Sequence, residues 1–402
     1  MNMSIEGIRN RSQIRVITAG CFLSYFLFGM VDNMKGQTIP VLMEDAGYSY
    51  SAGGTIVFCE YAGFFAAAFL AGVIADLLGK KSTLVIAGVV LSVGAGGYAF
   101  SSEFGMYAGF IFLIGLGLGM LELSGSNIIS GVHTADRAGF YLNLLNAFYG
   151  VGAILTPLVI GIMLEAGYSW RTVYKGSLAV IVPALLYFIL MKYPKDGDLQ
   201  SVAQGRFGRS CVGEIVRLIR CRKVMIMCLF NFVYVAAEIA VATWFVEFLH
   251  TGRGMTDEKS AFWFSAYFTL IMLGRLAGSF FVDRIGRLSS LLIFTGTAVI
   301  CLGTGVMGPE GAAWVLVLTG LGFSILFPTA TAVIAEVPSA NQGTMLGIFF
   351  ACGGLGGMAG PWLAGIVSEA AGVKAGMMVN VFFCMVMMGL VLILRRSEKL
   401  PS

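Results

Sequence analysis

Apolar residues dominate the chain in long runs that short polar segments interrupt. A helix needs about 18 or more nearly uncharged apolar residues to span the hydrocarbon core of a bilayer. About a dozen runs reach this length, at approximately 15–43, 51–78, 82–101, 105–132, 140–164, 171–192, 223–249, 260–282, 288–307, 311–337, 340–368 and 372–394. Because little sequence remains outside them, the pattern predicts an all-α integral membrane protein with twelve transmembrane helices.

Two loops between predicted helices repeat one motif about two hundred residues apart. Each copy has a Leu-Ala-Gly triplet, then an aspartate, a glycine three residues later and a basic residue. The residues are Asp76, Gly79 and Lys80 in one copy and Asp283, Gly286 and Arg287 in the other. A second repeat, with identical spacing, is Gly152, Pro157 and Gly161 against Gly356, Pro361 and Gly365. This duplication predicts two pseudo-symmetric six-helix halves around a polar cavity, the layout of a secondary transporter.

The halves are predicted at 1–192 and 223–402, with a cytoplasmic central loop at 193–222. Within that loop, Val212, Ile215, Val216 and Ile219 form an apolar stripe beside two arginines. The stripe predicts a basic amphipathic helix on the inner leaflet of the membrane. The first apolar run is too long for a cleaved signal core, so we expect it to be retained as the first helix.

Composition and loop charge support a membrane protein and give its orientation. Charged residues are 12% of the 402 residues and mean hydropathy is +0.85, whereas soluble domains carry about 25% charged residues. Nineteen of the 26 Lys and Arg residues lie on the side that holds the N-terminus. The positive-inside rule therefore predicts cytoplasmic termini in a plasma membrane, of the bacterial inner-membrane type. The net charge of +4 follows from this topology and indicates no nucleic-acid partner.

Several classes of site lack support in the sequence. The eight cysteines show no paired metal spacing, and two histidines are too few for a metal site. Gly115, Gly117 and Gly119 lie inside a predicted helix, where close helix packing explains them better than a dinucleotide fingerprint. We find no nucleophile motif and no phosphate loop. We therefore predict no cofactor, no metal and no enzymatic activity, and we expect a monomer.

Ionisable residues inside the predicted helices are candidates for function, because a charge in the bilayer is costly unless it is paired or hydrated. In the first helix, Lys35 lies one turn from Asp32 and can reach it. Glu60 of the second helix lies within ~3 Å of the same depth by helical rise. The three residues predict a buried cluster, serving either as a neutralised bridge or as a proton or substrate site.

The seventh predicted helix places Asn231, Tyr234 and Glu238 on one stripe. An aromatic ring beside a carboxylate and an amide suits a polyhydroxylated ligand, because the ring covers the apolar face of a sugar and the polar groups take its hydroxyls. Near mid-membrane, Glu238 could exchange a proton as the site opens. A Glu238 side chain that only bonds a neighbouring helix is the structural alternative.

Two further groups complete the candidate site. Glu122 on the fourth helix is a second acid, and Asn143 and Asn146 share one stripe of the fifth. Arg275 on the eighth helix stays charged, so it needs a carboxylate, carbonyl groups or an anionic ligand. Glu238 is one partner we consider, although helical rise places Arg275 ~10 Å nearer the cytoplasm; an inner-gate pairing is the other.

The duplicated loops carry the candidate gating residues: Asp76, Lys80, Asp283, Arg284 and Arg287. Charges at helix ends can bridge to neighbouring helices in one conformation and release them in the other. These residues are therefore predicted to act on conformation rather than on substrate.

The duplicated loops, the twelve runs and the charged central loop resemble the major facilitator superfamily across the whole chain. Four short segments resemble the fucose–proton symporter branch of sugar permeases within that superfamily. They are the run from Tyr234 through Glu238 to Trp244, and the pairs Gly274-Arg275, Leu121-Glu122 and Leu142-Asn143. That resemblance implies proton coupling at the helix-four glutamate, Glu122. The sequence departs from the branch at Gly36, where the branch has an acid four residues before a proline, and at Ser126, where it has an asparagine.

Together these observations predict import of a small polyhydroxylated solute, of the monosaccharide class, by proton symport with alternating access. Substrate binding is assigned to Asn143, Asn146, Asn231, Tyr234, Trp244 and Arg275, and proton coupling to Glu238, Glu122 and Asp32. Sodium stays open as the coupling ion, since carboxylates also bind it. A proton-driven exporter of drugs or metabolites is the alternative, because Gly150 to Pro157 loosely resembles the exporter motif of the superfamily. A non-transporting receptor is disfavoured by the lack of a sensory domain.

Overall fold

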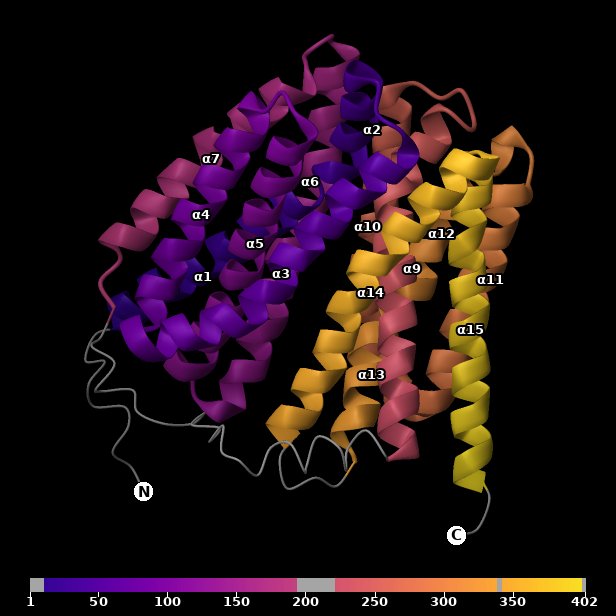
Figure 1. Cartoon of the computed structure of the whole chain (residues 1–402). Helices are drawn as coiled ribbons and strands as arrows, with labels where there is room; N and C mark the ends of the chain where they lie inside the picture. Colours follow the sequence, from indigo (N-terminus) through magenta and orange to yellow (C-terminus); the bar gives the residue numbers. More distant parts are fainter. Residues whose placement is uncertain (1–10, 194–220, 338–341, 400–402) are drawn as a thin grey trace. The chain divides into compact units, whose positions relative to one another are not determined.

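The computed structural model describes residues 11–193, 221–337 and 342–399, and all regular structure in these ranges is helical (Figure 1). The predicted amphipathic helix of the central loop lies almost entirely outside the described residues. The helices of the first part of the chain are α1 Arg11–Asp32, α2 Lys35–Ala46, α3 Tyr50–Leu78, α4 Lys80–Phe100, α5 Phe104–Val132, α6 Ala135–Glu165 and α7 Trp170–Leu190. Those of the second part are α9 Arg222–His250, α10 Asp257–Ile285, α11 Arg287–Met307, α12 Ala313–Ser324, α13 Leu326–Ala335, α14 Gln342–Ala371 and α15 Val373–Lys399, with a 3₁₀ turn at Glu310–Ala312.

Twelve spans in the described residues are long and apolar enough to cross a membrane, which confirms the predicted number. Ten of them are single helices. The spans Gln13–Ala46 and Trp314–Ala335 are each built from two helices, α1 with α2 and α12 with α13. The hydrophobic pattern did not predict these two interruptions.

The first interruption lies at Asn33 and Met34, between α1 and α2. The Asn33 side chain donates through Nδ2 to the Gly29 carbonyl at 2.8 Å, the acceptor that its backbone N–H would use in a continuous helix. The Met34 N–H bonds the Val31 carbonyl at 3.2 Å and forms a tight turn. The chain therefore leaves the α-helical pattern for two residues in the middle of a span.

The second interruption follows from Pro328, which has no N–H to give to the carbonyl four residues earlier, that of Ser324. The helix ends at Ser324 and restarts at Leu326. An unpaired carbonyl is costly inside a membrane. Arg275 of α10 satisfies it, since its Nε donates to the Ser324 oxygen at 3.2 Å.

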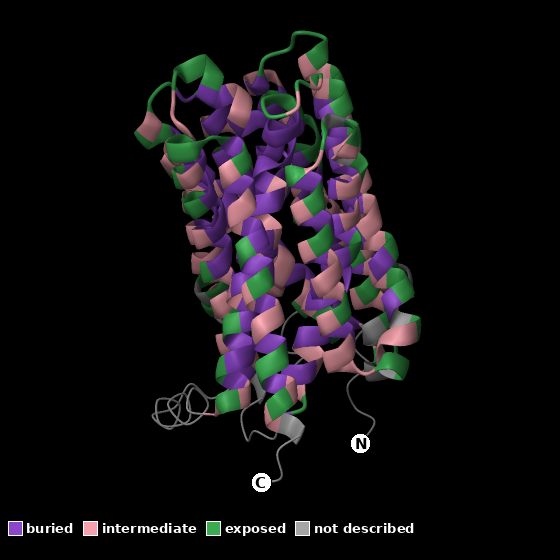
Figure 2. Cartoon of the chain, turned by 90° about the vertical axis from the view of Figure 1, so that its right-hand side faces the viewer, coloured by how far each residue is buried: buried purple, intermediate pink, exposed green. Residues whose placement is uncertain are grey.

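By its internal contacts the chain forms two compact units. One contains Met1–Lys35 with Cys59–Gln204, and the other contains Gly36–Phe58 with Gly205–Ser402. Buried and exposed residues alternate along the helices in the pattern that Figure 2 shows. The segment 36–58, which holds α2 and the first part of α3, thus groups with the C-terminal helices, and the predicted domain limits at 192 and 223 stay a prediction.

The glycine of the duplicated loop has the same backbone conformation in both copies. Gly79, between α3 and α4, has φ +88°, and Gly286, between α10 and α11, has φ +91°. Residues with a side chain rarely adopt this region. The sharp turn between two long helices therefore explains why each copy of the motif has a glycine at this position.

Glycines of the second repeat lie where two helices cross closely. A Cβ at Gly152 of α6 would lie 2.6 Å from the Phe26 oxygen of α1. A Cβ at Gly356 of α14 would overlap the Phe232 oxygen of α9. Close approach through small residues drives helix association in lipid. The pair α1 and α6 therefore packs through Gly152 in the way that the pair α9 and α14 packs through Gly356.

Replacing Gly356 with alanine is expected to lower the stability of the protein by about 1–3 kcal/mol, because the new methyl group must displace backbone rather than a flexible side chain. Thermal unfolding of the purified protein in detergent measures the effect. Gly347→Ala on the same helix is the matched control, since no atom lies within 4 Å of its added Cβ. Equal unfolding temperatures for the two variants would contradict the expectation.

Candidate functional site

The unit that contains α1 holds a buried ionic cluster at the interruption between α1 and α2. The Lys35 Nζ is paired with Asp32 Oδ1 and lies 3.3 Å from Glu60 Oε1. Exposed side-chain fractions are 5% for Lys35, 12% for Asp32 and 3% for Glu60. The predicted proximity of the three residues is confirmed. The Tyr149 hydroxyl, which the sequence analysis did not single out, donates to Asp32 Oδ2 at 2.9 Å.

Helix dipoles make this cluster dependent on its internal pairing. Asp32 is the last residue of α1, where the helix dipole disfavours a negative charge, and Lys35 is the first of α2, where it disfavours a positive one. Each charge is therefore stabilised by the opposite charge of the cluster rather than by its own helix. Removing one member leaves the others poorly placed in a buried environment.

Glu122 and the two asparagines of α6 belong to the same unit. Glu122 of α5 is half-buried and lies within electrostatic range of Asp32. Tyr25 of α1 donates to the Glu122 carbonyl at 3.3 Å. Asn143 and Asn146 are exposed, and Asn146 Nδ2 donates to the Leu142 carbonyl at 3.0 Å. The substrate roles of both asparagines stay predictions.

The second unit brings the predicted stripe of α9 together with Arg275. Glu238 Oε1 lies 3.6 Å from Arg275 Nη2, with 17% and 33% of the side chains exposed. The pairing that the sequence analysis considered is therefore present. Tyr234 is buried beside this pair and interacts electrostatically with both residues. Its ring meets the Phe323 ring edge-on at 6.0 Å.

Asn231 and Trp244, both of α9, each bond a backbone carbonyl of α14. Asn231 Nδ2 donates to Phe349 at 2.8 Å, and Trp244 Nε1 donates to Pro361 at 3.0 Å. Both side chains are buried. These bonds fix α9 against α14, and the substrate roles of both residues stay predictions.

The candidate gating residues lie at helix ends. Asp76 and Asp283 are in the last turns of α3 and α10, and their side chains are outside the described part of the structure. Lys80 Nζ donates to the Asn127 carbonyl of α5 at 3.3 Å. Arg287 pairs with Glu336, which directly follows α13, and Arg284 is exposed. Two of the basic residues therefore connect neighbouring helices.

Glu247 of α9 is an acid that the sequence analysis missed. Its side chain is 6% exposed and accepts a hydrogen bond from the Tyr50 hydroxyl at 2.7 Å. Glu247 lies within the predicted span 223–249, so it met the criterion applied to the other intramembrane acids. It lies near the end of that apolar run.

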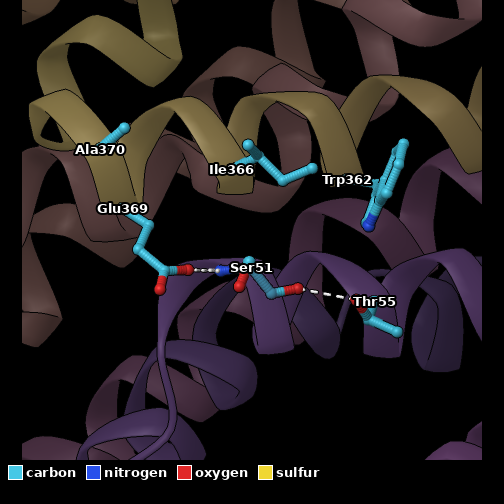
Figure 3. Close-up of a pocket in the computed structure, with 6 residues that line it drawn as sticks. All are labelled: Ser51, Thr55, Trp362, Ile366, Glu369 and Ala370. Carbon is cyan, nitrogen blue, oxygen red and sulfur yellow. Dashed lines mark hydrogen bonds between the residues drawn. The ribbon is translucent and has the colours of Figure 1, made fainter.

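A surface hollow of about 560 Å³ lies close by, between the start of α3 and the end of α14 (Figure 3). It is lined by Ser51, Thr55, Trp362, Ile366, Glu369 and Ala370. The Ser51 N–H donates to Glu369 Oε2 at 3.0 Å, so this carboxylate caps the first turn of α3. None of the predicted substrate residues lines the hollow.

The sequence matches the Major Facilitator Superfamily over residues 21–317 and 309–402. The chain belongs to this superfamily. It is a multi-pass membrane transporter rather than an enzyme, and its twelve spans agree with that membership.

The curated relatives that the chain matches are distant. The Bypass of stop codon protein 6 of Saccharomyces cerevisiae is 22% identical over 265 residues, covering 58% of this chain and 53% of that protein. The D-galactonate transporter of Escherichia coli O6:H1 is 25% identical over 268 residues, covering 59% and 61%. The glucose/galactose transporter of Brucella abortus biovar 1 is 24% identical over 252 residues, covering 59% of each. The alignments thus span less than two thirds of these relatives.

Solved structures of several transporters share the fold over nearly the whole chain. The nucleoside transporter NupG has a TM-score of 0.77 at 16% identity, covering 97% of this chain and 100% of that one. A D-xylose–proton symporter has a TM-score of 0.76 at 16% identity, covering 94% and 96%. A variant of the E. coli fucose–proton symporter FucP has 0.63 at 20%, covering 95% and 99%.

Proposed function

We propose that this superfamily member imports a small polyhydroxylated solute of the monosaccharide class by proton symport with alternating access. The observation that carries the proposal is the group on α9 and α10, in which the Tyr234 ring adjoins the pair of Glu238 and Arg275. Tyr234 is buried in this structure, so its ring would meet a solute only when the site opens. The opened group would offer an apolar ring face and charged hydrogen-bonding groups to one solute. The names of similar proteins, among them transporters of galactonate, glucose or galactose, and xylose, support this substrate class.

Proton coupling is supported by the two acceptors that Arg275 has. Its Nη2 lies 3.6 Å from Glu238 and its Nε donates to the Ser324 carbonyl at 3.2 Å. If Glu238 takes up a proton, the guanidinium keeps the carbonyl as a partner, so neutralising the carboxyl does not leave Arg275 without one. A carboxyl group with this arrangement can gain and lose a proton during the cycle.

Asn143 and Asn146 would supply exposed amide groups to the solute, and Glu122 and Asp32 would be the additional proton-coupling acids. The gating role of the duplicated loops remains part of the proposal. The distribution of Lys and Arg residues supports cytoplasmic termini. A monomeric state and a plasma membrane of the bacterial inner-membrane type complete the proposal.

Uptake into proteoliposomes tests the function. A panel of radiolabelled neutral monosaccharides and sugar acids is offered with and without an inward proton gradient, and a parallel series uses a sodium gradient. We expect the proton gradient to drive accumulation of at least one member of the panel. No accumulation of any sugar under any gradient would contradict the proposal and favour the exporter, and accumulation driven only by sodium would contradict proton coupling.

Replacing Glu238 with glutamine is expected to abolish accumulation driven by the proton gradient while exchange of labelled for unlabelled solute continues. The amide keeps the shape of the side chain but cannot carry the proton. Glu258→Gln is the matched control, because Glu258 is exposed in the first turn of α10. Full accumulation by the Glu238→Gln protein would remove Glu238 from the coupling mechanism.

A further inference from the structure

Two cysteines of the C-terminal helices lie against each other. The side chains of Cys228 of α9 and Cys352 of α14 are joined by a hydrogen bond. Cys228 is 8% exposed and Cys352 is half-buried. We propose that Cys228 and Cys352 form an oxidisable dithiol site, whose conversion to a disulfide joins α9 to α14 and slows transport.

The register of the two helices supports this pairing independently. Gly356 lies against the Phe232 carbonyl and Gly360 against the Ala236 carbonyl. Both pairs are separated by 124 residues in the sequence, and so are Cys228 and Cys352. The thiols therefore occupy the same line of contact, one turn before the first glycine. Figure 1 shows α9 and α14 side by side.

Close approach makes a disulfide geometrically feasible. The bond requires Cα atoms about 4.4–6.8 Å apart. Helices that cross with glycine against a backbone carbonyl, as α9 and α14 do at Gly356 and Gly360, bring residues in register closer than ordinary side-chain packing does. The sulfur atoms are already within hydrogen-bond reach, so little backbone movement is needed.

The chemistry assigns different roles to the two sulfur atoms. Cys352 is half-buried and more exposed than Cys228, so it is the thiol that a small oxidant such as hydrogen peroxide reaches first. Peroxide transfers one oxygen to this sulfur, giving a sulfenic acid and water. The Cys228 thiol then attacks that sulfur, the disulfide forms and the hydroxyl leaves as a second water. A thiol reductant reverses the reaction.

The position of the dithiol indicates its effect on transport. Asn231 follows Cys228 by three residues, and its bond partner Phe349 precedes Cys352 by three. A covalent link one turn from this hydrogen bond would hold α9 and α14 in a fixed register beside the stripe of Tyr234 and Glu238. Motion of either helix along the other would stop.

Counting alkylatable thiols tests the site without reference to any solute. The chain has eight cysteines. After hydrogen peroxide treatment of the protein in liposomes, we expect the wild type to lose two thiols, as measured by mass spectrometry after alkylation, and to regain them with dithiothreitol. Cys228→Ser and Cys352→Ser should each prevent the loss of a pair. Cys301→Ser, a buried cysteine on α11, should still lose two.

A wild-type protein that keeps all its thiols would overturn the proposal, as would a Cys228→Ser protein that still loses a pair. The same liposomes report on transport of the radiolabelled sugar that accumulates in the uptake assay. Oxidation should reduce its uptake by the wild type and by Cys301→Ser but leave uptake by Cys352→Ser unaffected. Unchanged uptake by a fully cross-linked wild type would overturn the inhibitory effect. The thiol count does not depend on the solute, so it would still show the disulfide if the protein transported no sugar. Failure of the proposed function and failure of the dithiol proposal are therefore distinguishable.

Discussion

Replacing Lys35 with methionine is expected to destabilise the protein by about 3–5 kcal/mol, the cost of removing one partner from a buried ion pair. The change leaves the Asp32 and Glu60 carboxylates without the ammonium group that both approach, and their side chains are only 12% and 3% exposed. Asp32 would also remain at the end of α1 that disfavours a negative charge. Yield of folded protein and its unfolding temperature in detergent measure the loss.

Neutralising the whole cluster should restore much of that stability. The triple variant Lys35→Met, Asp32→Leu and Glu60→Met removes the uncompensated charges, and replacing a buried ionic group as a set by apolar residues of similar volume is often close to neutral. Lys374→Met, at an exposed lysine of α15, is the control and should behave as the wild type. A triple variant no more stable than Lys35→Met alone would show that the charges of the cluster do not determine its energetics.

Replacing Arg275 with methionine is expected to lower uptake by about tenfold or more, equivalent to about 1.4 kcal/mol or more of lost interaction. The guanidinium holds the Glu238 carboxylate and the Ser324 carbonyl with different nitrogen atoms. Losing the second bond also leaves a buried carbonyl unsatisfied, which costs about 1–3 kcal/mol of stability. Arg275→Lys should restore only part of each effect, because an ammonium group lacks the fork that bonds both oxygens.

A second change separates the two roles of Arg275. Pro328→Ala in the Arg275→Met protein returns an N–H to the Ser324 carbonyl, so the unfolding temperature should rise again. Uptake should not recover, because Glu238 still lacks its counter-charge. If Pro328→Ala restored uptake as well, Arg275 would act on transport only by supporting the interrupted helix.

The hydrophobic pattern was enough to predict the number of spans, because each run must cross the bilayer and few soluble residues separate the runs. It could not predict the interruptions at Asn33 and Ile325, which depend on single side chains. At Asn33 the side-chain amide competes for the carbonyl of a helical residue. The pattern of apolar residues contains no information about this hydrogen bond. The Pro328 residue was visible in the sequence, but the arginine that satisfies the freed carbonyl comes from a different helix.

The candidate site was predictable where partners share a helix face or a depth. Lys35 is one turn from Asp32, and helical rise placed Glu60 at their level, so the cluster followed from spacing. Tyr149, which completes it, comes from α6 and carries no charge, so no such argument selects it. Glu247 lies inside the predicted span 223–249 and carries a charge, so the criterion applied to the other intramembrane acids would have selected it.

The repeated glycines of α6 and α14 give this chain an internal record of its own duplication. Gly152 and Gly356 each lie against the backbone of a neighbouring helix, α1 for Gly152 and α9 for Gly356. The charged residues on those partners have diverged: Asp32 of α1 meets a lysine from a broken span, and Glu238 of α9 meets an arginine from a separate helix. The two copies therefore share their helix packing but differ in their ionic pairs. Each half can serve as the reference against which changes in the other are measured.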